Sequence, residues 1–149
     1  MNIQQLIESL AKLLKLHKSL FELAIRKTGI LEAEDVPSLT ELLKEEQAHI
    51  LAIEKVEAER SRIAGNTALS ELLAIFPDEE RETLAGISSE LKDVMAKIKE
   101  QNALNQHLIT QSLKFISFSM SLVTPPQDDY NYGPNETGRT EKGLFNSKA

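Results

Sequence analysis

The fold is constrained most strongly by a stripe of mostly apolar residues, spaced three or four positions apart along the first 31 residues. Its members are Ile3, Ile7, Leu10, Leu14, His17, Phe21, Ala24, Thr28 and Leu31. This spacing is typical of one face of an α-helix held for about four heptads. Further apolar residues flank the stripe on both sides: Leu6, Leu13, Leu20, Leu16, Leu23 and Ile30. A face this wide predicts a bundle helix that packs against at least two neighbours.

Turn-forming and capping residues divide the rest of the chain. Asp35 and Pro37 indicate the start of a second helix that runs from about residue 37 to Ala64, just before Gly65. A short connecting helix is expected over residues 67–75.

A last long helix is predicted from about residue 78 to Val123, where Pro125 and Pro126 end it. We therefore expect an all-α fold, an antiparallel bundle of three long helices plus a short connecting helix, with a protruding C-terminal helix. Residues 1–123 would form a helical bundle domain, and residues 124–149 a flexible polar tail that cannot bury enough apolar surface to order itself.

Charge and composition exclude several function classes. The 149 residues include 17 Lys and Arg against 23 Asp and Glu, a net charge of −6, so nucleic-acid binding is disfavoured. The chain has no cysteine, which removes disulfides and thiolate metal sites. The N-terminus shows no signal peptide, and no stretch has the length and apolarity for membrane insertion. These features predict a cytoplasmic protein.

Residues with the chemistry of a catalytic or metal site do not form a complete motif. Glu46 and His49 have the Glu-x-x-His spacing of a di-iron bundle, but that site needs the motif twice, and neither His17 nor His107 supplies it. His49 is therefore interpreted as a surface or boundary residue, and His17 as a hydrogen-bonded core histidine. The sequence predicts no enzyme activity, no metal and no cofactor.

The predicted helix lengths do not match. At about 1.5 Å per residue, the first two helices span about 45 Å each and the last about 66 Å, an excess of about 14 residues near positions 110–123. Between Glu100 and Asp128 only Lys114 is charged, so the excess segment is apolar nearly all round. Two interpretations follow: a surface that binds another protein's helices, or an end that a staggered bundle or a second copy of the chain covers. If a second copy covers this end, the chain would be a homo-oligomeric helical scaffold.

Asn102 and Asn105 stand at positions of this helix where Ile or Leu would be expected. They are either partly exposed, or a polar layer that fixes the register of the bundle at some cost in stability.

A leucine-rich first helix is followed by an acidic second helix, then by the stretch Asn102-Ala-Leu-Asn105-Gln-His-Leu108-Ile109, an apolar run and Tyr132-Gly133. The order of these features along the chain resembles that of FlgN-type flagellar export chaperones. The resemblance covers nearly the whole chain. It implies a cytoplasmic type III export chaperone that holds hook–filament junction (hook-associated) proteins unassembled and delivers them to the export gate. A homodimer in the absence of client is compatible with this role.

The resemblance also implies two binding sites. The client would bind the C-terminal helix through an apolar set: Leu108, Ile109, Leu113, Phe115, Ile116, Met120 and Leu122. The cytoplasmic domain of the export gate would bind a tail tyrosine, with Tyr132 the better match and Tyr130 the alternative.

Overall fold

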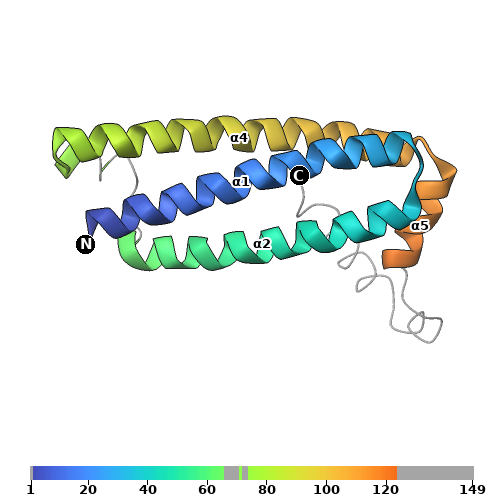
Figure 1. Ribbon diagram of the computed structural model, residues 1–149, viewed down its shortest axis with the longest axis horizontal. Coiled ribbons are helices and arrows are strands. Elements are labelled where there is room, and N and C mark those ends of the chain that lie inside the picture. Colours follow the sequence, from blue (N-terminus) through green and yellow to red (C-terminus); the bar gives the residue numbers. More distant parts are fainter. Residues whose placement is uncertain (1, 66–70, 72–73, 124–149) are drawn as a thin grey trace. The chain divides into compact units, whose positions relative to one another are not determined.

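A computed structural model describes residues 2–65, 71 and 74–123, apart from the side chains of residues 113, 116, 119 and 123. The elements are α1 (Ile3–Glu32), α2 (Val36–Ala64), α4 (Asp78–Thr110) and α5 (Leu113–Val123) (Figure 1). These residues contain no strand, so the predicted all-α fold of three long helices and a short one is confirmed. Most of the connecting helix expected at 67–75, and all of the tail at 124–149, lie outside the described residues.

The chain divides into two units, and each long helix contributes one part to each of them. Unit 1 comprises Met1–Leu23 and Leu43–Lys97, and unit 2 comprises Ala24–Leu42 and Ile98–Ala149. Within each unit the segments of α1, α2 and α4 lie side by side (Figure 1).

Unit 1 has an apolar core. Its buried members are Leu6, Leu10, Leu13, Ala64, Phe76 and Leu84. The start of α1 thus packs against the end of α2 and the start of α4, so α2 runs antiparallel to α1 and α4 runs parallel to it, as predicted. Two polar contacts keep the same register: Ser19 Oγ lies 2.7 Å from His49 Nε2, and Lys18 Nζ lies 3.4 Å from a Glu90 carboxylate oxygen.

Capping residues lie at the starts of α1 and α2 and at the end of α2, and those at Asp35 and Gly65 are as the sequence predicts. Asn2 Oδ1 accepts a hydrogen bond from the Gln5 amide at the start of α1. Asp35 caps α2 in the same way, through the Ser38 amide at 3.2 Å. Gly65 follows α2 with φ of +65°, the left-handed conformation that glycine adopts without a steric cost.

The prediction of one helix from about residue 78 to Val123 is wrong. α4 ends at Thr110, and α5 begins at Leu113 after a turn. The Thr110 hydroxyl donates to the His107 carbonyl at 2.9 Å, and the Ser112 amide bonds to the Ile109 carbonyl, which tightens the last turn. With 33 residues, α4 is almost as short as α1 with 30 and α2 with 29, so the helix stops instead of extending alone.

Candidate functional site

The candidate site is α5 and the corner of unit 2 on which it rests. α5 has eleven residues, of which only Lys114 is charged. Its first turn lies against the turn between α1 and α2 (Figure 1), to which it is joined by two hydrogen bonds.

Glu34 forms that corner in an unusual backbone conformation. Its φ is +54°, and among the described residues it is the one non-glycine residue with a positive φ. The Glu34 amide bonds to the Leu31 carbonyl and the Asp35 amide to the Ile30 carbonyl, the pattern of a Schellman motif. Glycine usually takes this position, because a side chain there is sterically disfavoured.

Glu34 holds α5 through both its side chain and its backbone. The Ser112 hydroxyl donates to Glu34 Oε1 at 2.9 Å, and Lys114 Nζ donates to the Glu34 carbonyl oxygen at 3.0 Å. Lys114 also lies close enough to Asp35 to act on its carboxylate. The pKa of Asp35 is lowered, mainly by the hydrogen bond from the Ser38 hydroxyl, then by that from the Ser38 amide, and to a smaller extent by the charge of Lys114.

The predicted client-binding residues have different surroundings. Phe115 is fully buried, with 0% of its surface exposed, whereas Met120 is 54% and Leu122 is 49% exposed. Leu108 and Ile109, in the last turns of α4, are half-buried. The side chains of Leu113 and Ile116 lie outside the described residues, and so do Tyr130 and Tyr132. The client site and the gate site therefore stay predictions.

Unit 2 also contains a buried polar layer between α1 and α4. Asn105 is 2% exposed, and its Nδ2 donates to the Ala24 carbonyl at 3.0 Å. The Thr28 hydroxyl donates to Asn105 Oδ1 at 2.5 Å, and Gln101 Nε2 donates to Thr28 Oγ1 at 2.6 Å. Of the two interpretations of the asparagines, the polar layer therefore holds for Asn105; Asn102 is half-buried.

Sequence reasoning missed the residues that fix α5 in place. Glu34 and Ser112 had no signal, since a glutamate seldom takes the left-handed position at a helix end. Lys114 did have a signal in the sequence. It is the single charge between Glu100 and Asp128, and an isolated charge in an apolar segment needs a partner. Thr28 and Gln101 were hidden because only tertiary packing brings them to Asn105.

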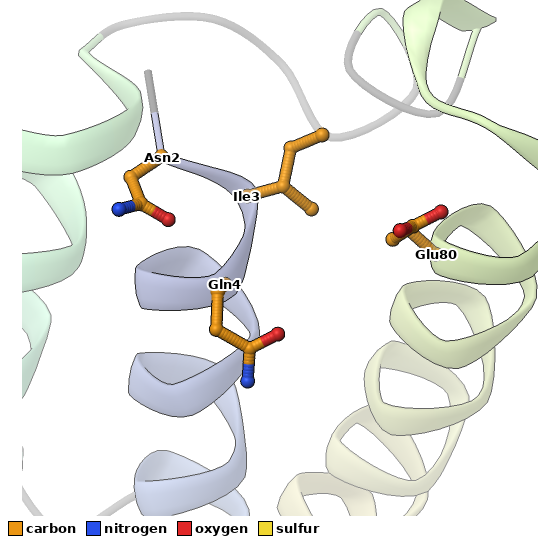
Figure 2. A pocket seen from close by; sticks show the side chains of 4 residues that line it. All are labelled: Asn2, Ile3, Gln4 and Glu80. Carbon is orange, nitrogen blue, oxygen red and sulfur yellow. The ribbon is translucent and has the colours of Figure 1, made fainter.

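The other polar features do not form a site. An open hollow at the start of α1 is lined by Asn2, Ile3, Gln4 and Glu80, which do not converge on a common point (Figure 2). His17 is half-buried, and its Nδ1 bonds to the Leu13 carbonyl at 2.7 Å. His49 bonds to Ser19 and to the Glu45 carbonyl, a boundary position as predicted. Within the described ranges, no three His, Asp or Glu side chains gather to hold a metal ion.

Comparison with known proteins decides the family. A sequence model described as FlgN protein matches residues 1–140. The chain belongs to the FlgN family. It is also 30% identical, over 160 residues that cover all of both chains, to the uncharacterized protein YvyG of Bacillus subtilis (strain 168). No solved structure matches.

Membership in the FlgN family identifies the class of function. FlgN proteins are chaperones connected with flagellar export and not a family of enzymes. None of the helices in the described part of the chain has the length and apolarity to span a membrane. The family therefore directs attention to a protein-binding surface, and α5 is the element with the most apolar composition.

Proposed function

We propose that this chain is a cytoplasmic type III export chaperone that binds hook-associated proteins through α5, keeps them from assembling early and delivers them to the export gate. FlgN family membership supports the class of function. The exposed apolar side chains of α5 support this helix as the binding surface.

The observation that carries the proposal is the contrast between two sides of α5. Phe115 is fully buried, and Met120 is more than half exposed. Five residues of helix place Met120 about 140° around the axis from Phe115, on the outward side. A helix with a single charge and apolar residues on both sides is typical of one that covers a second surface when a partner helix arrives.

Met120 and Leu122 supply two contacts of a releasable complex, and the other members of the predicted client set supply the rest. Full burial of a Met or Leu side chain contributes about 1.5–3 kcal/mol. After the costs of association and ordering, a handful of such contacts gives affinities near the micromolar range. Such a complex dissociates by competition and needs no nucleotide.

The test compares apolar residues of equal exposure on different helices. The double variant Met120→Glu/Leu122→Glu should weaken binding of the terminal coiled-coil segment of a hook-associated protein at least about tenfold, because each change places a charge in the contact. Leu51→Glu is the matched control, since Leu51 is 56% exposed but lies on α2 in unit 1. Titration calorimetry measures both, and circular dichroism verifies that the helices are retained.

Two outcomes would contradict the proposal. Equal loss of binding in the α5 variant and in Leu51→Glu would place the site elsewhere. A stable dimer in light scattering that no client segment dissociates would instead favour the homo-oligomeric scaffold, with α5 covered by a second copy.

For delivery, we extend the proposal to the tail. Tyr132, or alternatively Tyr130, would bind the cytoplasmic domain of the export gate, as the family resemblance implies. A site about ten residues beyond α5 leaves the client-bound helix unobstructed, so both partners can be held by one chain.

A further inference from the structure

The contacts of Glu34 give α5 a role that its exposed side chains do not explain. We propose that Glu34, Ser112 and Lys114 form a latch that keeps α5 docked on the corner of unit 2, and that the client binds α5 after the latch opens and Phe115 is released. This inference rests on the proposed function, because it concerns how the same helix meets the client.

The first argument is the residue type at the corner. Position 34 has φ of +54° and closes a Schellman motif, so glycine would suit it better than glutamate. Glycine, however, has no carboxylate to accept the Ser112 hydroxyl. A non-glycine residue kept in this region at an energetic cost is a reason to look for a function of its side chain. Here the side chain's hydrogen bond is with α5.

The second argument is the weakness of the attachment. Both hydrogen bonds to Glu34 are exposed to water, where each competes with solvent. The helical ladder of α4 ends at the Gln111 amide, and the Ser112 amide bonds to the Ile109 carbonyl instead, so α5 can separate without unwinding α4. Among its described side chains, α5 is held by exposed hydrogen bonds and by the buried ring of Phe115, and an element held in this way opens locally, well before the whole chain unfolds.

The third argument concerns what opening provides. In the docked state Phe115 is the largest fully buried side chain of the described chain and is inaccessible to any partner. Opening adds its aromatic surface to that of Leu122, which lies about 20° around the helix axis from Phe115, and leaves Met120 exposed on the other side. Eleven residues are too few for a stable helix alone in water, so the opened state needs a partner helix.

These steps predict how the latch affects affinity. If the client binds the open state, the observed affinity is the intrinsic one reduced by the fraction of open molecules. Weakening the latch should therefore tighten client binding, and closing it permanently should weaken binding. A surface used only in its docked form would respond to neither change.

The first experiment measures the latch without any client, by amide hydrogen exchange on the full-length chain. In Glu34→Gly the carboxylate is lost and the left-handed position is relieved, so residues 113–123 should exchange about five to ten times faster. At the same time the resistance of the whole chain to urea should stay equal or rise. A residue that merely stabilises the corner would move both readouts in the same direction.

Two variants serve as controls for this exchange experiment. Ser112→Ala removes the same hydrogen bond from the other side and should accelerate exchange of residues 113–123 to a similar extent. Glu34→Gln retains an oxygen that accepts from Ser112 and should exchange as the parent chain does. Unchanged exchange in both Glu34→Gly and Ser112→Ala would overturn the latch.

The second experiment closes the latch covalently. The chain has no cysteine, so a Glu34→Cys/Ser112→Cys variant reacts with a short bifunctional thiol reagent at these two positions alone. The cross-linked chain should bind the client segment about tenfold more weakly than the same variant before cross-linking, and Glu34→Gly should bind more tightly than the parent.

The outcomes separate this inference from the proposed function. Equal affinity before and after cross-linking would overturn the latch and leave α5 as the client site. If no variant binds the client, the proposed function fails, and the exchange of residues 113–123 still decides whether the latch exists.

Discussion

Unit 1 and unit 2 both bury apolar side chains between their helices, and they differ in the hydrogen bonding of one buried polar residue in each, Ser88 and Asn105. Unit 1 buries leucines and a phenylalanine, and its described part includes one buried hydroxyl, that of Ser88, without a hydrogen-bond partner. Unit 2 buries an amide, Asn105, whose donor and acceptor both have partners. The Asn105 side chain of unit 2 therefore makes directional contacts that the Ser88 hydroxyl of unit 1 does not make.

This difference bears on how firmly the register of the helices is fixed. Apolar contacts stabilise in proportion to the area buried and tolerate small displacements of one helix along another. The hydrogen bonds of Asn105 are satisfied in one register of α1 and α4 alone, as with polar residues at the centre of coiled coils. We infer that the polar layer around Asn105 fixes the geometry against which α5 docks.

The largest expected effect is on the free energy of unfolding, when two fully buried residues, one from each unit, are replaced by alanine. Leu84→Ala in unit 1 should lower the free energy of unfolding by about 2–5 kcal/mol. Phe115→Ala removes more volume, and in a cooperative core it would cost about 3–5 kcal/mol. We expect it to cost less than Leu84→Ala, because the loss cannot exceed the free energy that holds α5 in place.

Urea denaturation followed by circular dichroism measures this difference, with hydrogen exchange of residues 113–123 as the local readout. The Phe115→Ala chain should show fast exchange in α5 and a nearly unchanged global transition. If both variants shift the transition equally, α5 belongs to the same cooperative unit as the leucine core, and the comparison between the units fails.

The second effect compares the two buried polar residues. Asn105→Leu keeps the approximate volume but removes two hydrogen bonds, and it should cost about 1–3 kcal/mol of stability. Ser88→Ala is the counterpart in unit 1. It removes a buried hydroxyl without a partner and introduces a better helix former, so stability should stay equal or rise by up to about 1 kcal/mol.

Thermal unfolding of both variants tests this pair. A more stable Asn105→Leu chain would show that the polar layer is not satisfied as the hydrogen bonds indicate. A clear loss of stability in Ser88→Ala would show that its hydroxyl has a role in the apolar core.

The sequence was sufficient for those parts of the fold that depend on periodicity. The stripe from Ile3 to Leu31 and the capping residue Asp35 gave α1 and the start of α2 within a residue or two. The order and direction of the long helices followed because short connections leave few arrangements. In these segments the capping residues and the apolar spacing predict the same helices, so each prediction supports the other.

The break between α4 and α5 could not be predicted in this way. Residues 110–112 contain neither proline nor glycine, and the apolar pattern continues across them. What ends α4 is the gain from burying Phe115 and bonding Ser112 to Glu34, residues separated by 78 positions. A contact of that range leaves no trace in local spacing, which is also why the sequence did not distinguish the buried Phe115 from the exposed Met120.

The smallest effect is a pH dependence at Asp35 in unit 2, compared with Glu57 in unit 1. Hydrogen bonds from Ser38 lower the pKa of Asp35, and a hydrogen bond from Arg60 lowers that of Glu57. Each carboxylate therefore binds a proton less readily in the folded chain than in the unfolded one. Their contribution is fully present above the unfolded pKa, near 4, and is lost as the pH falls through the lower folded value.

Asp35→Asn separates the two contributions, because asparagine is an equally good cap but does not titrate. Near neutral pH its stability should be close to that of the parent chain, and less changed than in the two comparisons above. Below about pH 4 the variant should lose less stability on acidification than the parent does. Urea titrations at neutral and acidic pH measure this, with Glu57→Gln as the matched variant in unit 1. Identical acid sensitivity in Asp35→Asn and the parent would mean that the cap at the corner of α2 does not respond to protonation, and that the acid response arises in other carboxylates.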